Sequence, residues 1–417
     1  MRFSRHVVKL SFANTPMVGN LANGYSIGLS DEGAKICDRL FCEDVEKTEI
    51  ALVDEALFEH LLAGGFFDEG SCQQPLGSAY LHVTQRCNLD CLGCYSFDRH
   101  RNKLEDPSFE QLSKAIRELS LGGVTSLVIS GGEPFLRDDL PELLSYAKSE
   151  CKIQTINVAT NGTILSRDTL KKIAPSVDMV SVSFDGFSRS SPAPIRKEQR
   201  FDQLVDTVNA LNDYGIAAKI VPTIHSKNIN ELTEYISLSQ SLHATVSYSL
   251  FTGSFYDDEI AGLIPNDDDL CTLGATVFAQ NSCKLSTVED APLGISLSLT
   301  RTCGAGTKTV SVAADGSVYP CHMLHVEDFK MGNLFCDSIV DVLGSLPALA
   351  FRKSFSSANE DCANCSYRWF CGGGCKARSY MAFGSFCKND PYCPMFKSFY
   401  GCFEQQLIQQ LDSRKEV

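Results

Sequence analysis

The sequence predicts an α/β protein whose main part is a partial (βα)6, TIM-like barrel of parallel strands with helices outside. One observation predicts this fold class, and a second predicts the number of domains. Strand and helix patterns alternate from residue 79 to residue 252, which is typical of βα units in a parallel sheet. The chain has 417 residues, more than a single core usually organises, so two or three domains are expected.

The segment before the barrel predicts a small winged-helix-like α+β domain. Short alternating strands come first, an Asn-Gly turn joins them into a hairpin, and helices with N-terminal capping residues follow. The expected elements are strands at 6–11 and 25–29, the turn at Asn23-Gly24, a helix capped by Ser30 and a helix near 54–62 that ends at Gly64-Gly65. A plain cap packed on the barrel is the alternative interpretation of this segment.

Six strands are expected in the barrel. Each is a short β-branched or alternating run that ends in polar residues or glycine. They are expected at 79–84, 125–130, 154–160, 179–184, 216–224 and 244–251. Helices are expected between them, and the clearest begins after Ser108, where Gln111 completes a capping box.

Three cysteines follow the first barrel strand with the spacing CxxxCxxC: Cys87, Cys91 and Cys94. In such barrels the loops after the strand C-termini form the active site. Three thiolates from one loop can hold three irons of a 4Fe-4S cube, which leaves the fourth iron for a small molecule. The spacing alone also allows zinc or no metal.

Polar groups follow the next strand ends. The second strand runs into Gly131-Gly132-Glu133, the third into Asn161-Gly162, and the fourth places Ser181, Ser183 and Asp185 on one face. Glycines allow close backbone approach, and hydroxyl with carboxylate suits a ribose diol. Each group alone is also typical of an ordinary turn or strand, but their order on consecutive strand ends favours one shared site.

Together these residues resemble the radical S-adenosylmethionine (SAM) enzymes, over roughly residues 78 to 250. The resemblance implies that the three cysteines bind a 4Fe-4S cluster whose open iron chelates SAM. It implies further cofactor contacts from Gly131, Gly132 and Glu133 at the methionine amino group, Ser183 and Asp185 near the ribose, and Asn161 nearby. Reductive cleavage of SAM would give a 5′-deoxyadenosyl radical that abstracts hydrogen from unactivated C–H bonds.

One position departs from the family pattern. The family usually has an aromatic residue just before the third cysteine, whereas Gly93 stands there and Tyr95 follows the cysteine. Tyr95 is therefore the aromatic candidate beside the cofactor, and the packing of adenine is the feature that this departure affects.

Seven more cysteines lie near the C-terminus, and together they resemble the SPASM extension, which carries two auxiliary 4Fe-4S clusters. The resemblance covers about residues 303 to 393. It implies Cys303, Cys321 and Cys375 as ligands of the first auxiliary cluster, and Cys362, Cys365, Cys371 and Cys393 as ligands of the second. A structural zinc site is the alternative, although seven thiolates exceed the needs of one zinc ion.

The first auxiliary set lacks one ligand. Some relatives have a cysteine where Thr309 stands, and the missing ligand could be Cys271, Cys283, Cys336 or Cys387. Alternatively, that iron is open to a substrate thiolate.

His322 follows Cys321, where sulfatase-maturating members usually have an acidic residue that serves as the base. The absence of that acidic residue makes the sulfatase-maturating activity less expected. His322 itself is a second-layer group or, more readily, a neutral core residue.

Composition limits the partners. The 19 cysteines form two dense groups instead of spread pairs, so a disulfide scaffold is not expected. No signal-peptide pattern and no run of roughly 20 apolar residues is visible, so we expect a cytoplasmic protein with no membrane contact. A formal charge of −14 argues against nucleic acid and favours a small molecule or peptide.

The expected function is that of a radical SAM peptide maturase with three 4Fe-4S clusters, making a thioether or carbon–carbon crosslink in a ribosomally made precursor peptide. The N-terminal pattern resembles the domain that binds leader peptides as an added strand, and an external donor such as flavodoxin or ferredoxin would supply electrons. The alternatives are a radical enzyme acting on a protein side chain or a small cofactor precursor, and a non-catalytic metal-stapled scaffold. The expected domains are 1–75 for peptide recognition, 76–252 for the barrel, 253–300 as a bridge, 301–402 for SPASM and 403–417 as a tail.

Overall fold

The computed structural model describes residues 1–68, 75–96, 101–252, 258–281, 297–355 and 359–415. The chain divides into two compact units. The barrel unit comprises residues 73–265 and 304–355, and the terminal unit comprises residues 1–72, 266–303 and 356–417. None of the helices in the described ranges combines the length and apolar character that a bilayer span requires.

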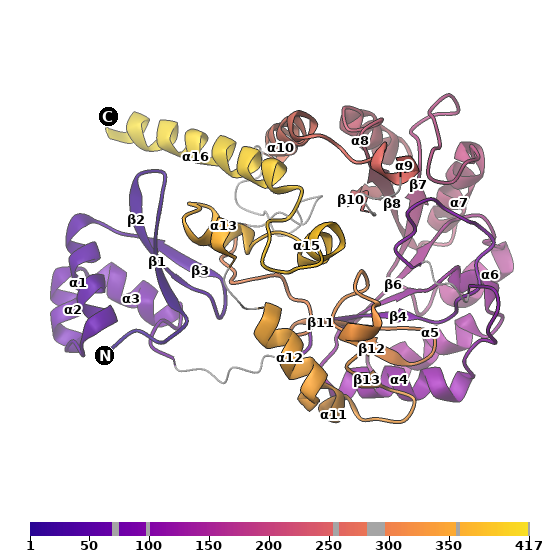
Figure 1. Cartoon of the computed structure of the whole chain (residues 1–417), viewed down its shortest axis with the longest axis horizontal. Coiled ribbons are helices and arrows are strands. Elements are labelled where there is room, and N and C mark those ends of the chain that lie inside the picture. The colour runs from indigo at the N-terminus through magenta and orange to yellow at the C-terminus, as the bar shows by residue number, and fades with distance from the viewer. Residues whose placement is uncertain (69–74, 97–100, 253–257, 282–296, 356–358, 416–417) are drawn as a thin grey trace. The chain divides into compact units, whose positions relative to one another are not determined.

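A sheet forms the centre of the barrel unit (Figure 1). Its parallel strands lie in the order β10-β8-β7-β6-β5-β4-β11, β9 pairs with β8, and β12 and β13 extend the sheet in antiparallel fashion. The strands are β4 Ser78–His82, β5 Ser126–Ser130, β6 Thr155–Thr160, β7 Met179–Phe184, β8 Ala217–Ile224, β9 Thr245–Val246, β10 Ser249–Leu250, β11 Thr309–Val312, β12 Ser317–Tyr319 and β13 Gly332–Asn333.

Helices follow the strands of this sheet. Their bounds are α4 Phe109–Leu121, η1 Pro134–Leu136, α5 Leu140–Ser149, α6 Arg167–Ile173, α7 Phe201–Asp213, α8 Leu232–Ser241, α9 Asp258–Ala261, η4 Glu327–Phe329, α11 Ile339–Gly344 and α12 Leu346–Phe355. The capping box predicted at Ser108 and Gln111 is confirmed: each side chain accepts a hydrogen bond from the other residue's backbone N–H.

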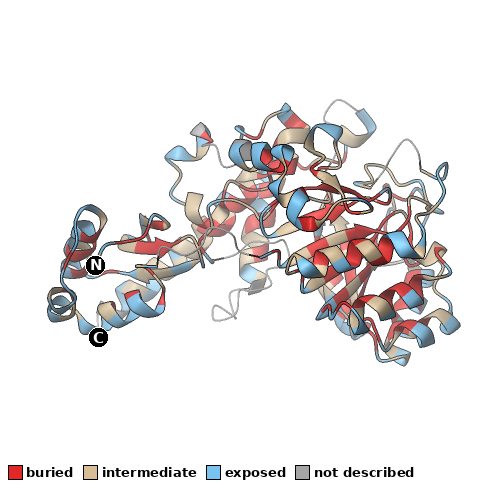
Figure 2. Cartoon of the chain, turned by 90° about the horizontal axis from the view of Figure 1, so that it is seen from below, coloured by how far each residue is buried: buried red, intermediate tan, exposed pale blue. Residues whose placement is uncertain are grey.

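The strand register explains which face of the sheet carries the apolar core. Leu81, Ile129, Val158 and Val180 pair across β4, β5, β6 and β7 and are all buried in one core with the helices (Figure 2). One residue further along, His82 pairs with Ser130. Because side chains alternate along a strand, these polar groups point to the opposite face.

The predicted barrel strands are confirmed with one change. Five lie within about two residues of their expected positions, and the sixth is divided into β9 and β10. The sequence did not predict β11, which pairs with β4 and brings residues 309–312 to the sheet. Residues 301–402 were predicted as one cysteine-rich domain. The two units share this segment, because residues 304–355 belong to the barrel unit and the rest belongs to the terminal unit.

The terminal unit begins with an antiparallel sheet in the order β1-β2-β3. Its first elements are β1 Val7–Phe12, β2 Thr15–Asn20, β3 Tyr25–Gly28, α1 Asp31–Cys42, α2 Lys47–Val53 and α3 Glu55–Ala63. The Ser30 cap is confirmed, since Ser30 Oγ accepts the Gly33 N–H at 3.1 Å. The turn at Asn23-Gly24 is present, but it joins β3 to β2 and not to the strand expected at 6–11, which pairs with β2. The strand β2 and the helix α2 were not predicted. Val18, Leu40 and Leu61 are fully buried in the core of this segment.

The remaining helices of the terminal unit surround the C-terminal cysteines. They are α10 Asp267–Asn281, α13 Glu360–Ala363, α14 Arg368–Cys371, α15 Lys376–Phe383 and α16 Cys393–Lys415. The helix α16 runs unbroken through residues 402 and 403, where the sequence analysis places the start of a tail. Cys72 and Cys283 lie outside the described residues.

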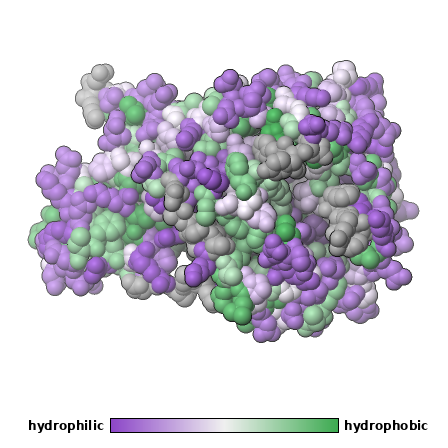
Figure 3. Space-filling view, viewed as in Figure 1, coloured by the Kyte–Doolittle hydropathy of each residue, from purple (hydrophilic) through white to green (hydrophobic). Residues whose placement is uncertain are grey.

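Hydrophilic residues predominate on the face of the protein shown in Figure 3.

Candidate cofactor and cluster sites

The loop that carries the cysteine triad is fastened to the Gly-Gly-Glu turn through backbone contacts. Thr84 O accepts the Gly132 N–H at 2.8 Å, and Arg86 O accepts the Glu133 N–H at 2.7 Å. A Cβ atom on Gly132 would lie 2.1 Å from Arg86 O, and Gly131 has φ +142°. Both glycines are therefore required for the strand ends to approach each other this closely.

Glu133 is fully buried and ties two strand ends together. Its Oε1 accepts hydrogen bonds from Phe135 N at 3.1 Å and Thr160 Oγ1 at 2.8 Å, and its Oε2 accepts one from Asn161 N at 2.8 Å. Burial raises the pKa of Glu133, and these hydrogen bonds oppose that rise. In this structure Glu133 thus fixes the β5 and β6 ends, a role the sequence did not indicate.

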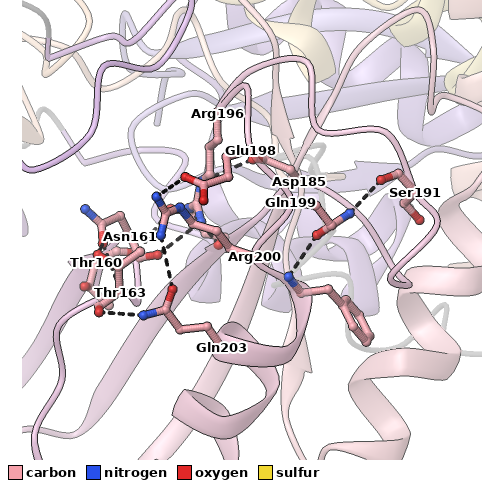
Figure 4. Close-up of polar contacts among 12 residues, drawn as sticks. Thr160, Asn161, Thr163, Asp185, Ser191, Arg196, Glu198, Gln199, Arg200 and Gln203 are labelled. Atoms are coloured by element: carbon pink, nitrogen blue, oxygen red, sulfur yellow. Dashed lines mark hydrogen bonds and ion pairs between the residues drawn. The ribbon is translucent and has the colours of Figure 1, made fainter.

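Asn161 links β6 to the triad loop. Its Nδ2 donates to Asn88 Oδ1 at 2.8 Å and lies 4.0 Å from Cys87 Sγ. Its Oδ1 accepts from Thr163 N and Thr163 Oγ1 (Figure 4). The structure therefore brings the predicted Asn161 to the first cysteine of the triad.

Arg196 is a site residue that the sequence analysis missed. Its side chain is only 3% exposed, and its Nε lies 3.3 Å from Asp185 Oδ2. Its guanidinium also donates to Asn161 O at 3.1 Å and Ser183 O at 2.8 Å (Figure 4). One buried cation thus holds the ends of β6 and β7 beside Asp185. A single arginine in a loop carries no recognisable sequence signal.

The strand ends have acceptors that suit the ribose of SAM. Asp185 Oδ2 is buried and receives no hydrogen bond from any described residue. Ser183 Oγ donates to Thr160 O at 3.2 Å, while Ser181 Oγ is directed to Asn157 Oδ1 at 3.0 Å. A hydroxyl group could donate to Asp185 Oδ2, which otherwise faces only the Arg196 cation at 3.3 Å, so Asp185 fits the ribose end of the cofactor.

The thiols of the triad are partly buried. Burial raises the pKa of Cys91 to about 11 and also raises that of Cys87. Such thiols are protonated at neutral pH until a metal displaces the proton. Three thiols on one loop are a donor set suited to iron, although the described structure does not draw their sulfurs together around one metal position.

Five aromatic and imidazole rings contact one another beside the end of β4. We call these residues the ring group: Tyr80, His82, Tyr95, His322 and His325. His322 stacks on Tyr80 at 4.1 Å between ring centroids and meets the edge of Tyr95 at 5.2 Å. The ring centroids of His82 and His325 lie 4.7 Å apart. Tyr95 Oη is 2.7 Å from Ser130 Oγ.

Burial favours the neutral form of His82 and His322. Burial lowers the pKa of His322 to about 4 and holds that of His82 well below its usual value. His322 Nδ1 lies 3.7 Å from Cys321 Sγ. Tyr95 directly follows Cys94 and His322 directly follows Cys321, so the contact between these two rings joins the two cysteine-bearing segments within the barrel unit.

The four cysteines predicted for the second auxiliary cluster line one pocket in the terminal unit. Its lining includes Cys362, Cys365, Cys371, Cys393, Tyr367, Arg368, Asn389, Asp390 and Lys397. Gly372, Gly373 and Gly374 all have positive φ, between 63° and 84°, which explains the Gly-Gly-Gly run between Cys371 and Cys375. The structure thus gathers these four thiols around one space.

Asp390 organises this pocket. It is 3% exposed and accepts hydrogen bonds from Cys375 N at 2.6 Å and Tyr392 N at 2.9 Å. Arg378 donates to both of its carboxylate oxygens, at 2.9 and 2.6 Å. A Cβ atom on Gly374 would lie 2.5 Å from Asp390, so the glycine run and the carboxylate pack directly together.

We expect Asp390→Ala to reduce the iron content of the purified protein by about four atoms per chain. The substitution removes the acceptors that hold the backbone at Cys375 and leaves the Arg378 guanidinium, 11% exposed, without its carboxylate. Iron and sulfide analysis after anaerobic purification measures the effect. Asp412→Ala, near the end of α16, is the control, and equal iron in both variants would contradict the prediction.

Of the cysteines predicted for the first auxiliary cluster, Cys303 and Cys375 belong to the terminal unit and Cys321 belongs to the barrel unit. Its assignment stays a prediction. Of the candidates for the missing ligand, Cys271, Cys336 and Cys387 are exposed. Across the described ranges, no three His, Cys, Asp or Glu side chains are gathered tightly enough to bind a single metal ion.

Comparison with known proteins identifies the family. The sequence model of the radical SAM superfamily matches residues 81–238, and that of the SPASM iron-sulfur cluster-binding domain matches residues 303–366. The chain belongs to the radical SAM superfamily. It is an enzyme with a SPASM domain, and membership implies 4Fe-4S clusters and SAM as cofactors. The non-catalytic scaffold is therefore excluded.

Named relatives of this radical SAM enzyme differ in activity. The AdoMet-dependent heme synthase of Methanosarcina barkeri is 26% identical over 75% of this chain and 94% of its own length. The subtilosin biosynthesis protein AlbA of Bacillus subtilis is 27% identical over 73% of this chain and 68% of its length. The structure of Streptococcus suis SuiB bound to precursor peptide SuiA aligns with a TM-score of 0.60 at 17% identity, over 93% of this chain and 98% of SuiB.

The residues of the radical SAM enzyme can be assigned tasks from their positions. When bound, SAM with a reduced cluster supplies hydrogen-atom abstraction. Cys87, Cys91 and Cys94 would hold the iron, Asp185 would accept a hydrogen bond from a ribose hydroxyl, and Arg196, paired with Asp185, would keep that carboxylate in place. Glu133 and the two glycines fix the strand ends on which these groups stand.

Proposed function

We propose that this radical SAM enzyme is a peptide maturase that abstracts hydrogen from a ribosomally made precursor peptide and installs a thioether or carbon–carbon crosslink. The observation that carries the proposal is the three-stranded sheet at the N-terminus, whose β3 strand pairs with no described strand other than β2, although Leu299 N donates to Gly24 O at 3.1 Å just before β3 begins. Open strand edges bind extended peptides as an additional strand.

The two edges of this sheet are not equivalent. The β1 edge ends at Phe12, whose ring packs on Phe370 at 4.9 Å and Phe403 at 5.4 Å within the terminal unit. On β3, Tyr25 is 40% exposed and its hydroxyl lies 3.4 Å from His60 Nδ1 on α3. The β3 edge is therefore the proposed site for a leader peptide.

Fold comparison supports this use of the N-terminal segment. The alignment with SuiB covers 93% of this chain, so it includes more than half of residues 1–75 even if every unaligned residue lies there. At 17% identity the likeness concerns the fold. SuiB itself was solved with its precursor peptide, and AlbA is named for the biosynthesis of a bacteriocin.

The Tyr25→Ala variant is expected to weaken leader binding by about tenfold or more, since large exposed aromatic residues carry much of the energy of peptide interfaces. The measurement is fluorescence anisotropy with labelled short peptides encoded beside the gene. Leu52→Ala, at an 87% exposed position on α2, should bind like the unmodified protein. Equal affinities for both variants would place the leader elsewhere.

We propose three 4Fe-4S clusters: one on the triad, one in the pocket of Cys362, Cys365, Cys371 and Cys393, and one on Cys303, Cys321 and Cys375 with an exchangeable iron. A flavodoxin or ferredoxin would supply the electrons. Anaerobic iron analysis and incubation of the enzyme with SAM and reductant test this. Fewer than about eight irons per chain, or no 5′-deoxyadenosine, would contradict it.

The ring group is the proposed wall for the substrate side chain. Two of its members, Tyr80 and His82, belong to β4, and two others, Tyr95 and His322, directly follow Cys94 and Cys321. His82 Nε2 is buried and has no hydrogen-bond partner among the described residues. A neutral imidazole with a vacant nitrogen can accept a hydrogen bond from a substrate N–H, O–H or S–H group.

A small cofactor precursor is the second candidate substrate, because the relative from Methanosarcina barkeri is an AdoMet-dependent heme synthase matched over 94% of its length. The two candidates differ in what the N-terminal sheet does. Binding of a neighbouring peptide at β3 supports the maturase, whereas substrate-dependent 5′-deoxyadenosine formation with a tetrapyrrole and none with peptides supports the second candidate.

A further inference from the structure

Asn102 contacts the first cysteine of the triad. Asn102 Oδ1 accepts the Cys87 N–H at 2.9 Å, and Asn102 Nδ2 donates to Cys87 O at 3.0 Å. The backbone at Asn102 has φ +60°, a left-handed conformation that asparagine tolerates better than most residues. Asn102 is therefore anchored on both backbone groups of Cys87.

Arg101, the residue before this anchor, contacts the third cysteine. Its Nη2 lies 3.5 Å from Cys94 Sγ and also donates to Ser96 O at 2.9 Å and Ser96 Oγ at 3.0 Å. The two contacts with Ser96 fix the direction of the guanidinium. Arg101 and Asn102 together thus close the triad loop from Cys87 to Cys94.

A guanidinium at this distance from a ligand sulfur acts on the charge of the site. Three thiolates make a bound cluster anionic, and reduction adds a further negative charge. A permanent cation nearby lowers the electrostatic cost of that electron, and a hydrogen bond to sulfur acts in the same direction. Arg196 is the cation on the Cys91 side, and it is already paired with Asp185.

We propose that Arg101 is a positioning residue that raises the reduction potential of the radical SAM cluster through its contact with Cys94, and that Asn102 holds Arg101 in place. This inference rests on the proposed role of the triad as the cluster site. It concerns neither the identity of the substrate nor the auxiliary clusters.

The test compares Arg101→Gln with Arg101→Lys in the full-length, anaerobically loaded enzyme. Two quantities are measured: iron per chain, and the midpoint potential of the EPR signal that changes when SAM is added. We expect Arg101→Gln to keep its iron and to shift this potential to a more negative value, because the charge is lost. Arg101→Lys should stay near the unmodified enzyme, as should the surface control Arg167→Gln, whose side chain is 77% exposed.

Asn102→Ala tests the anchoring role. It should shift the potential in the same direction as Arg101→Gln, and the double variant should shift it no further, because Asn102 acts through Arg101. An unchanged potential in Arg101→Gln with full iron overturns the proposal, and so does equal iron loss in both Arg101 variants. If the unmodified protein has no SAM-responsive signal, the triad assignment itself fails.

Discussion

Replacing Cys91 with alanine is expected to abolish the formation of 5′-deoxyadenosine completely. Cys91 is the middle ligand of the triad, and its neighbours Cys87 and Cys94 lie on the same short loop. Two thiolates cannot hold the cluster that binds SAM, so we expect iron to fall by about four atoms per chain. Liquid chromatography of the SAM reaction and iron analysis of the same preparation measure both effects.

Cys42→Ala is the matched control. Cys42 is exposed at the end of α1 and belongs to neither cysteine group, so this variant should keep its iron and its activity. The second auxiliary pocket is in the other unit and should remain loaded in Cys91→Ala. Retained SAM cleavage in Cys91→Ala would refute the triad as the catalytic cluster site.

Replacing Arg196 with methionine is expected to lower the free energy of unfolding of the barrel unit by about 3–5 kcal/mol and to abolish SAM binding. The substitution leaves the carboxylate of Asp185, 9% exposed, without its cation, and breaking a buried pair from one side is strongly destabilising. It also removes the donors to Asn161 O and Ser183 O. Denaturant unfolding and equilibrium dialysis of labelled SAM are the measurements.

Two further variants show whether the buried charge is the cause. Arg167→Met removes a mostly exposed arginine and should change stability little. Adding Asp185→Asn to Arg196→Met removes the uncompensated carboxylate and should recover part of the lost stability but not SAM binding, because Asp185 is the proposed ribose acceptor. No recovery in the double variant would show that packing, rather than charge, explains the loss.

Much of the fold followed from the sequence because each local signal agreed with the global arrangement. The alternation of apolar residues along β5, β6 and β7 predicted buried strands, and the Ser108 capping box predicted the start of α4. The elements that were missed lack such signals. The strand β2 contains Pro16 and Gly19, and both residues are unfavourable in strands.

Long-range pairing was also beyond the sequence. The strand β11 joins β4 across more than 200 residues, and no local pattern specifies which edge a distant strand will meet. This pairing brings the segment with Ser311, Cys321, His322 and His325 into the barrel unit. The ring group could not be predicted for that reason, although Tyr95 and His322 were each singled out from the sequence.

The sequence by itself determined the residue types and spacings of the chemistry: the triad, the glycine turn, the polar strand ends and the seven later cysteines. These depend on short stretches of chain whose order along the sequence is also their order on consecutive parallel strands. The tertiary structure alone decided which charges accompany them. Arg196 meets Asp185 in the segment between β7 and α7, and Arg101 meets Cys94 in the segment between β4 and α4. No residue pattern specifies these pairings, because the conformation of each segment in the folded chain decides which charged groups come within a few ångströms.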